Sequence, residues 1–407
     1  MPAHSDPIKP ASRTRDIEYA VRDVTLLAAK VAATGQQMLY LNIGDPNKFD
    51  FVTPRSMVEA AYQAMLDNRN GYSDSSGIKD GVAAIERAAQ RKGIRNVRDI
   101  FITTGASEGI EIALTALAEP GDNILTPSPG YPLYTAVLAK LGVENNPYYL
   151  DESNGWQPDV DDIAKKINAR TRAIVVINPN NPTGSVASKQ TLQRLIELAI
   201  ERNLVVFADE IYDQLLLGDA QHTSLAAISD DACVLTFNGL SKSYLAPGFR
   251  IGWCIVSGPQ KKVAPFNEAM QKIVRARLCA NQPLQWAIQP ALDGDQAHLA
   301  EMKQKLTRRR DLTVERLNAI PGISCVAPQG AFYAFPRIEL GLDDKTFVND
   351  LMAATGVVVV PGSGFGQKPG TQHFRVVFLP DEATLERAYA AIADHVRTTL
   401  GSPRGGR

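Results

Sequence analysis

Short segments rich in β-branched residues alternate with longer segments of helical pattern through the middle of the chain. This alternation constrains the fold more than any other feature. The expected strands are Ile100–Thr104, Asn123–Thr126, Ala173–Ile177, Leu204–Ala208, Val234–Phe237 and Ile251–Val256. Expected helices lie between them, with apolar residues at helical spacing, at Ser107–Leu117, Tyr134–Leu141 and Lys189–Glu201. Such alternation predicts an α/β fold whose mostly parallel sheet is covered by helices on both faces.

A different pattern follows the charged helical segment His298–Leu317, in which Arg308-Arg309-Arg310 is expected to form a solvated face. The expected strands and helices of this region are Ile323–Val326, Ala331–Phe335, Asp344–Ala354, Val357–Val360, Phe374–Leu379 and Asp381–Leu400. The pattern predicts a second, smaller α+β domain. We therefore expect an N-terminal arm and part of the small domain in residues 1–50, a large domain in 51–290, and a C-terminal small domain in 291–407.

Composition argues against several classes of protein. Lys and Arg total 43 against 44 Asp and Glu, so a formal net charge of −1 offers no basic field for nucleic acid. No apolar segment approaches the roughly 18–20 residues of a membrane-spanning helix, and Met1–Asp16 lacks the apolar core of a secretory signal. The cysteines form no CxxC pair and no HExxH motif occurs, so we expect free thiols in a reducing cytoplasm and no metal site.

The residues that follow the expected strands are the candidates for chemistry, because ligands of open α/β sheets bind beyond the carboxyl ends of the strands. The first strand leads into Gly105-Ala106-Ser107 at a helix start, where backbone N–H groups favour a phosphate. The third leads into Asn178–Gly184, a loop that is rich in side-chain amides. Both loops therefore offer polar groups directly above the sheet.

Two further strands end in ionisable side chains. Asp209 and Tyr212 follow one strand, and Lys242 follows the next, with Arg250 eight residues farther on. One sheet edge thus combines a phosphate-binding loop, an acid, a phenol, a lysine and an arginine. Pyridoxal phosphate requires this set of groups. Its aldehyde condenses with a lysine, a carboxylate partners its ring nitrogen, and its phosphate binds N–H groups and a guanidinium.

The motifs at these positions also resemble those of a known family. From about Arg15 to about Leu400 the chain resembles the class I/II (fold type I) pyridoxal-phosphate-dependent aminotransferases. The motifs that carry the resemblance are Asn42-Ile43-Gly44-Asp45-Pro46, Thr104-Gly105-Ala106-Ser107, Pro129-Gly130-Tyr131-Pro132, Asn181-Pro182-Thr183-Gly184, Asp209-Glu210-Ile211-Tyr212, Ser241-Lys242, Arg250-Ile251-Gly252, Pro328-Gln329-Gly330-Ala331-Phe332 and Phe374-Arg375. Their shared order and spacing make the resemblance specific.

The resemblance implies a role for each residue around the cofactor ring. Lys242 would bond covalently to the cofactor and, once displaced by substrate, move the proton between the substrate and the cofactor. Asp209 would keep the ring nitrogen protonated. Tyr212 and Asn181 would bind the ring's phenolate oxygen, and Tyr131 would stack on the ring face.

The resemblance also implies a phosphate site and a dimer. Ala106, Ser107, Ser241 and Arg250 match the family's phosphate-binding positions. Many relatives carry Ser three residues before the lysine, where this chain has glycine, so the contact made by Ser241 is left open. Tyr72 resembles a tyrosine that reaches the phosphate of the neighbouring subunit, which implies a homodimer.

The substrate site implied by the resemblance lies between the two domains. Arg375 would bind the substrate α-carboxylate through its planar guanidinium, with the backbone of Gly44 and the side chain of Asn181 adding hydrogen bonds. A distal carboxylate needs a second cation, for which Arg275 and Arg277 are both candidates. The sequence does not choose between them.

Several stretches most resemble the alanine-forming branch of the family. They are Ile17–Asp23, Leu41–Asp50, Ala276–Asn281 and Phe374–Pro380. The implied reaction is that of L-alanine with 2-oxoglutarate, giving pyruvate and L-glutamate. An aspartate- or aromatic-directed aminotransferase and a pyridoxal-phosphate carbon–sulfur lyase would share this cofactor site and remain alternatives.

Two other classes fit less well. A transcription-regulator effector domain would need an attached DNA-binding module, and only about 50 residues precede the expected sheet, with no basic recognition helix. Gly362-Ser363-Gly364 suggests a dinucleotide site, but Gln367 stands where the third glycine of that fingerprint should fall.

Overall fold

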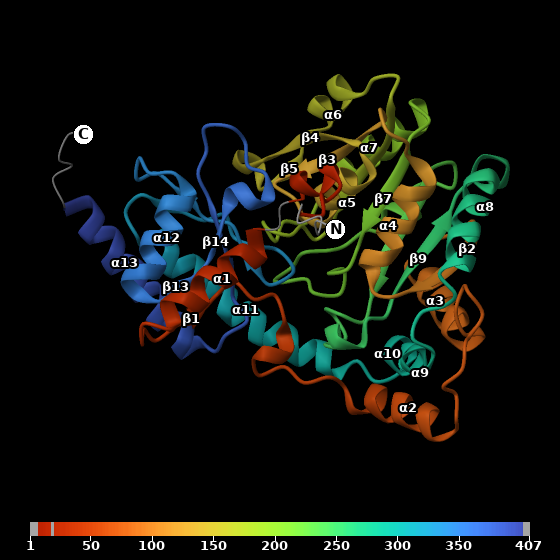
Figure 1. Cartoon of the computed structure of the whole chain (residues 1–407), viewed down its shortest axis with the longest axis horizontal. Coiled ribbons are helices and arrows are strands. Elements are labelled where there is room, and N and C mark those ends of the chain that lie inside the picture. Colours follow the sequence, from red (N-terminus) through yellow and green to blue (C-terminus); the bar gives the residue numbers. More distant parts are fainter. Residues whose placement is uncertain (1–6, 18–19, 402–407) are drawn as a thin grey trace, which may run out of the picture.

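A computed structural model describes residues 7–17 and 20–401. Glu18 and Tyr19, which belong to the stretch Ile17–Asp23 singled out above, lie outside the described residues, as do the side chains of residues 20–23. Two lobes are visible in Figure 1. The large lobe is the eight-stranded sheet with the helices α2–α10, and the small lobe contains α1, α11–α13 and the remaining short strands.

The sheet of the large lobe has the strand order β2-β9-β8-β7-β6-β3-β4-β5. Its strands are β2 (Val97–Thr103), β3 (Asn123–Ser128), β4 (Glu144–Asp151), β5 (Gln157–Pro158), β6 (Thr171–Ile177), β7 (Val205–Asp209), β8 (Cys233–Gly239) and β9 (Gly252–Ser257). The pairs from β8 to β4 are parallel, while β9 is antiparallel to both of its neighbours and β5 to β4. The mostly parallel sheet predicted from the sequence is therefore confirmed.

Helices bury both faces of this sheet. Alternate residues of β6 belong to different apolar clusters: Ile174 lies with Leu192 of α7, and Val175 lies with Ile110 of α4 on the other face. The helices of the large lobe are α2 (Arg55–Leu66), α3 (Lys79–Arg91), α4 (Ala106–Leu117), α5 (Leu133–Leu141), α6 (Val160–Lys166), α7 (Lys189–Glu201), α8 (Gln260–Ala276), α9 (Gln282–Gln285) and α10 (Ile288–Asp293). Strands buried on both faces account for the continuous apolar segments of the sequence.

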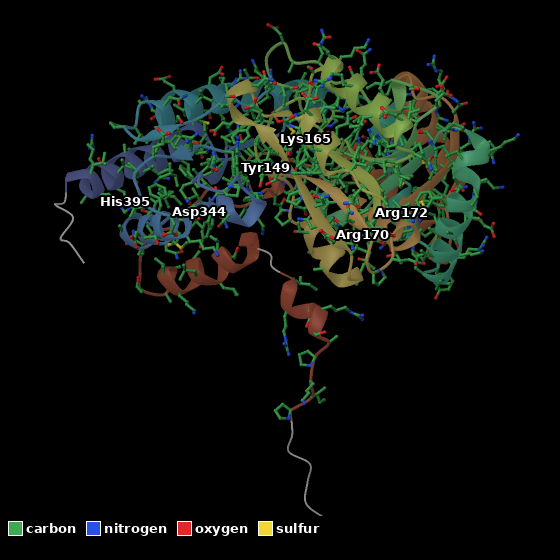
Figure 2. All side chains as sticks on the ribbon, turned by 90° about the horizontal axis from the view of Figure 1, so that it is seen from above. Tyr149, Lys165, Arg170, Arg172, Asp344 and His395 are labelled. Carbon is green, nitrogen blue, oxygen red and sulfur yellow. The ribbon has the colours of Figure 1, made fainter. Side chains whose placement is uncertain are left out.

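The small lobe joins segments from opposite parts of the chain. The strand β1 (Leu39–Tyr40) pairs in parallel with β13 (Val357–Val358), and β15 pairs antiparallel with β11 and β14. Its other elements are α1 (Ala20–Ala32), α11 (Ala297–Asn318), β10 (Ile323–Ser324), β11 (Tyr333–Ala334), β12 (Arg337–Ile338), α12 (Asp344–Thr355), β14 (Val360–Pro361), β15 (Phe374–Val377) and α13 (Glu382–Gly401). Seen from above, Asp344 and His395 lie in this lobe, away from Tyr149 and Lys165 of the large lobe (Figure 2).

One residue of the arginine run on α11 departs from the sequence expectation. Arg309 is only 2% exposed, and its two terminal nitrogens donate to the two carboxylate oxygens of Asp50 at 2.8 Å. It also donates to the carbonyl of Leu379 at 2.6 Å. The expectation of a solvated face is therefore wrong for Arg309, because an ionised partner from the N-terminal segment satisfies the buried guanidinium.

No helix among residues 7–17 and 20–401 is long and apolar enough to cross a membrane. The cysteines are free, as expected from their spacing, and Cys233, Cys254 and Cys325 are buried.

Candidate functional site

A pocket lies at the carboxyl ends of the parallel strands, against the small lobe. Its lining includes nearly all the site residues predicted from the sequence: Gly44, Ala106, Ser107, Tyr131, Asn181, Asp209, Tyr212, Ser241, Lys242, Arg250 and Arg375. The exception is Tyr72, which is 82% exposed and does not line the pocket within one chain. The lining also includes Tyr333 of β11, which the sequence analysis missed.

Lys242 reaches the pocket from the loop that follows β8. Its Nζ donates a 2.8 Å hydrogen bond to the carbonyl of Gly44, so the amine bridges the segment after β8 and the segment after β1. Burial lowers the pKa of Lys242 to about 8, against an opposing effect of Asp45 and with help from the cations Arg375 and Arg250. An amine with this pKa is partly neutral near pH 7–8, which a nucleophile or a general base requires.

Asp209 ends β7 and lies almost fully buried beneath the pocket. Burial raises its pKa to about 6, while hydrogen bonds from the Ile211 N–H and the Tyr134 hydroxyl act in the opposite direction. The Tyr134 hydroxyl lies 3.2 Å from Asp209 Oδ2. Sequence reasoning missed Tyr134, because nothing in its helical segment indicates that the buried phenol meets a carboxylate 75 residues away.

Two tyrosines from different lobes meet in the pocket. The hydroxyls of Tyr212 and Tyr333 are 2.9 Å apart. Burial raises the pKa of Tyr212 well above its ordinary value, and the neighbouring Tyr333 adds to this effect, so the phenol is protonated and can donate. A Cβ built on Gly44 would come within 2.4 Å of the Tyr333 hydroxyl, so a side chain at that position would have to displace this hydroxyl.

Arg375 extends from β15 and is 3% exposed. Its terminal nitrogens donate to Asn181 Oδ1 at 3.2 Å and to the carbonyl of Asn42 at 2.9 Å. The guanidinium lies 4.6 Å from the ring centres of both Tyr333 and Phe365. These contacts hold a planar cation at the boundary of the two lobes, where it can bind a carboxylate.

The other end of the pocket is suited to an anion. Gly105 precedes α4 with φ of +73°, and a Cβ there would come within 2.2 Å of Arg250 Nη2, so the guanidinium lies directly against the helix start. A Cβ on Gly252 would come within 2.3 Å of the Ala106 backbone nitrogen. Glycine at both positions thus lets Arg250 and the N-terminus of α4 converge, as a phosphate site requires.

Gly239 stands where many relatives carry serine, three residues before Lys242, and the local packing explains the glycine. A Cβ on Gly239 would lie 2.8 Å from the carbonyl oxygen of Ile251 and 2.9 Å from the Cα of Gly252. The close pairing of β8 with β9 therefore disfavours a side chain there, while Ser241 is left at the pocket.

Neither arginine considered for a distal carboxylate lines the pocket within one chain. Arg275 is exposed on α8, and Arg277 donates to the carbonyl of Ile102 at 2.8 Å and lies 3.5 Å from Glu108.

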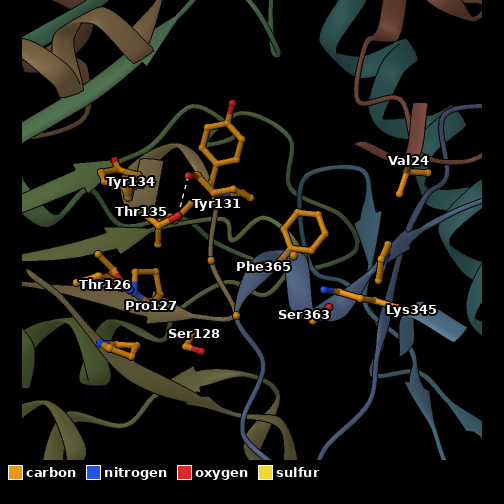
Figure 3. Close-up of a pocket in the computed structure, with 18 of the residues that line it drawn as sticks. Val24, Thr126, Pro127, Ser128, Tyr131, Tyr134, Thr135, Lys345, Ser363 and Phe365 are labelled. Atoms are coloured by element: carbon orange, nitrogen blue, oxygen red, sulfur yellow. Dashed lines mark hydrogen bonds between the residues drawn. The ribbon is translucent and has the colours of Figure 1, made fainter. Parts of the chain in front are cut away.

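A second cavity adjoins the pocket and shares Tyr131 and Ile177 with it. In Figure 3, Tyr131 and Phe365 lie on opposite sides of this cavity, and Lys345 and Ser363 line it beside Phe365. It lies between the two lobes, so a change in their separation would alter its width.

The combined groups can perform a defined kind of chemistry. The pocket can accept a flat ring with an anion at one end: Arg250 and the start of α4 face the anion, and Asp209 can contact the opposite ring edge. Lys242 supplies an amine with a lowered pKa, and Arg375 can bind a carboxylate. This donor set fits an amino-group or proton transfer at a carbon next to a carboxylate.

Comparison with known proteins agrees with this geometry. Residues 36–392 match the family described as aminotransferase class I and II. The chain is 41% identical over 396 residues to the glutamate-pyruvate aminotransferase AlaA of Escherichia coli K12, covering 95% of this chain and 97% of that protein. It is 42% identical over 380 residues to the alanine aminotransferase of Mycobacterium tuberculosis H37Rv, covering 91% and 88%. The structure of an alanine aminotransferase from Pyrococcus furiosus superposes with a TM-score of 0.92 at 42% identity, covering 96% of this chain and all of that one.

Proposed function

The chain belongs to the class I and II aminotransferases, and from this membership we propose that it transfers the amino group of L-alanine to 2-oxoglutarate, giving pyruvate and L-glutamate. The observation that carries the proposal is the gathering of Lys242, Asp209 and Arg375 around one pocket in a chain about 41% identical to glutamate-pyruvate aminotransferases. The reaction consists of two half-reactions. L-Alanine binds and pyruvate is released in the first, and 2-oxoglutarate binds and L-glutamate is released in the second.

The cofactor in this proposal is pyridoxal phosphate, which supplies an aldehyde for the amino group and a ring that accepts electrons from the substrate carbon. Arg250, Ser241 and the N–H groups of Ala106 and Ser107 would hold its phosphate. The space that Cβ atoms would fill at Gly105 and Gly252 supports this fit.

Other residues of this chain hold the ring and move the proton. Asp209 would hold the ring nitrogen, Tyr212 and Asn181 would hold the phenolate oxygen, and Tyr131 would cover one ring face. Lys242 would hold the cofactor covalently, and its neutral Nζ would accept the proton of the substrate α-carbon. The lowered pKa of Lys242 supports this role, because a base must be neutral to accept a proton.

The substrate α-carboxylate binds Arg375, with the backbone N–H of Gly44 and the side chain of Asn181 completing its site. This assignment is supported by the burial of Arg375 and by its place between Tyr333 and Phe365. Because amino and oxo substrates share this carboxylate, one site serves both half-reactions.

We also propose a homodimer in which Tyr72 reaches the phosphate of the neighbouring subunit. Support comes from the exposed apolar side chains on and around α2: Val52, Val58, Tyr62, Met65, Leu66 and Tyr72. An apolar face of this kind is typical of a protein interface.

The domain division and the location are also part of the proposal. Residues 51–290 would form the cofactor domain, and residues 291–407 with part of 1–50 would form the small domain. The free cysteines support a cytoplasmic location.

The half-reaction tests the proposed function. The visible absorbance of the purified protein is recorded before and after separate additions of L-alanine, L-glutamate, L-aspartate and L-phenylalanine. We expect alanine and glutamate to convert the cofactor to its amine form, and pyruvate or 2-oxoglutarate to reverse the change. Conversion with aspartate or phenylalanine alone would reassign the substrate, and release of ammonia and pyruvate without an oxo acid would indicate a carbon–sulfur lyase.

Lys242→Ala is the matched variant for this test. It should bind the cofactor without a covalent bond and lose transamination. Appreciable turnover by this variant would contradict the role given to the lysine.

A further inference from the structure

A buried histidine connects the two lobes close to the substrate site. His373 precedes β15 and is 1% exposed. Its Nε2 lies 3.3 Å from Oε2 of Glu152, which directly follows β4 of the large sheet. Its Nδ1 lies 3.2 Å from Oε1 of Gln367. Both ring nitrogens therefore face an oxygen atom.

The orientation of the Gln367 amide follows from its other contacts. Its Nε2 lies 3.3 Å from Oδ2 of Asp344 and 3.5 Å from Oε1 of Gln372. Asp344 Oδ2 also accepts the Ser363 N–H at 2.5 Å, so it is an acceptor. The amide nitrogen must point to these acceptors, which leaves its oxygen facing His373.

Two acceptors determine the protonation of the imidazole. A neutral imidazole has a single N–H, so one of its nitrogens would present a lone pair to an oxygen lone pair. A doubly protonated ring donates to both oxygens and forms an ion pair with Glu152. Burial by itself disfavours a charged ring, so the second proton depends on the neighbouring carboxylate of Glu152 and on the hydrogen bond to Gln367.

The histidine is also connected to Arg375 by packing. The ring of His373 stacks on Phe335, with centroids 4.8 Å apart and an angle of 5° between the planes. Phe335 contacts Phe365 edge to face at 6.1 Å, and Phe365 lies 4.6 Å from the Arg375 guanidinium. His373 and Arg375 are two residues apart, so their side chains leave the backbone on the same side.

We propose that His373 is held as a doubly protonated imidazolium between Glu152 and Gln367, and that this ion pair is a positioning element for Arg375. The pair fixes the start of β15 against the large lobe, and the aromatic stack transmits this placement to the guanidinium. This role rests on the proposed function of Arg375 in binding the substrate carboxylate. It predicts that substrate affinity, and not the chemistry at Lys242, depends on the charge of His373.

Other charged groups lie near the pair. Arg337 Nη1 lies 3.4 Å from the same Glu152 oxygen, so the imidazolium shares this carboxylate with a second cation. On the far side of Gln367, Asp344 is 4% exposed. The thiol of Cys325 also faces Glu152, and its pKa is raised to about 12 by burial and by the carboxylate, so it carries no charge.

The test uses the holoenzyme and two variants, Glu152→Gln and His373→Asn. The first keeps an oxygen acceptor and removes only the charge, at a side chain that is 22% exposed and therefore tolerant of the change. His395→Asn, at a histidine of α13 whose ring packs against Phe347, is the matched control. Kinetics with L-alanine and 2-oxoglutarate are combined with 15N spectra of histidine-labelled protein at the assay pH, with His373→Asn assigning the signal.

We expect the KM of both substrates to rise roughly 10-fold in each variant, as for one lost hydrogen bond to a charged group. The kcat and the cofactor absorbance should stay within about twofold of the parent enzyme. The His373 signals should report two protonated nitrogens in the parent and one in Glu152→Gln. An unchanged KM in Glu152→Gln, or a neutral imidazole in the parent, would overturn the proposal. If alanine fails to convert the parent's cofactor, the proposed function fails instead, while the 15N spectra still decide the charge of His373.

Discussion

The Tyr134 hydroxyl donates a 3.2 Å hydrogen bond to Oδ2 of Asp209, and both side chains are buried under the candidate active site. This bond favours the ionised carboxylate, against a burial effect that raises the pKa of Asp209 to about 6. The phenol thus helps Asp209 to remain a charged partner at neutral pH without touching the substrate.

Tyr134→Phe should therefore weaken the interaction proposed between the Asp209 carboxylate and the cofactor ring nitrogen. A hydrogen bond to a charged group contributes about 1.5–3 kcal/mol, so we expect cofactor affinity or kcat/KM to fall about 10- to 100-fold. Fluorescence titration of the cofactor and steady-state rates measure the two effects. Tyr148→Phe, at a buried tyrosine whose hydroxyl donates to the backbone carbonyl of Val175 at 2.7 Å, is the control. Equal affinity and rates in Tyr134→Phe and the parent would contradict the assignment.

Arg375→Lys should raise the KM for alanine at least about 10-fold. A lysine keeps the charge but cannot form two parallel hydrogen bonds or stack between Tyr333 and Phe365. The same change at the exposed Arg308 should leave the KM unchanged. A KM within twofold of the parent for Arg375→Lys would show that the carboxylate binds elsewhere.

Lys92→Met should destabilise the fold. Lys92 forms an ion pair with the buried Asp213, which follows Tyr212 in the segment that carries the site. Removing one partner of a buried pair leaves an uncompensated charge and costs about 3–5 kcal/mol of the free energy of unfolding, measured by urea denaturation. Lys92→Met/Asp213→Asn should recover part of the loss. An unfolding free energy equal to that of the parent would mean that water already compensates Asp213.

Lys242→Met should stabilise the cofactor-free protein at neutral pH. Because the pKa of Lys242 is about 8 when folded and near 10.5 otherwise, the folded chain binds fewer protons between these values. Below pH 8 the buried ammonium carries its full penalty, which disappears as the pH rises toward 10.5. We expect a gain of about 1–3 kcal/mol at pH 7 that is nearly gone at about pH 11. A gain that does not change with pH would rule out this explanation.

The strands that carry the site could be predicted because burial on both faces makes them continuous apolar segments. The strand expected at Ala173–Ile177 extends from Thr171 to Ile177, and that expected at Leu204–Ala208 extends from Val205 to Asp209. The strand β4 was not recognised, because its sequence is mostly polar and contains a proline. Its position between β3 and the edge strand β5 gives it a partly exposed face, which removes the apolar signal.

The site residues after these strands could be located from sequence, since parallel strands bring their carboxyl ends to one edge. Tyr134 and Tyr333 could not be located in this way, because their roles depend on hydrogen bonds to Asp209 and Tyr212, which lie far away in the sequence. Arg309 was misjudged for the same reason: only the folded chain brings Asp50 to it. The roles assigned to the pocket residues stay predictions until the variants are measured.

The parallel pairing of Leu39–Tyr40 with Val357–Val358 joins segments that are roughly 300 residues apart. Contacts of such high sequence separation form late, because the entropy of closing the intervening chain must be lost first. During synthesis the N-terminal strand must therefore wait for most of the chain, while the parallel sheet can already assemble. Since Arg375 lies beside this last-formed sheet, the candidate carboxylate site is completed only in the final stage of folding.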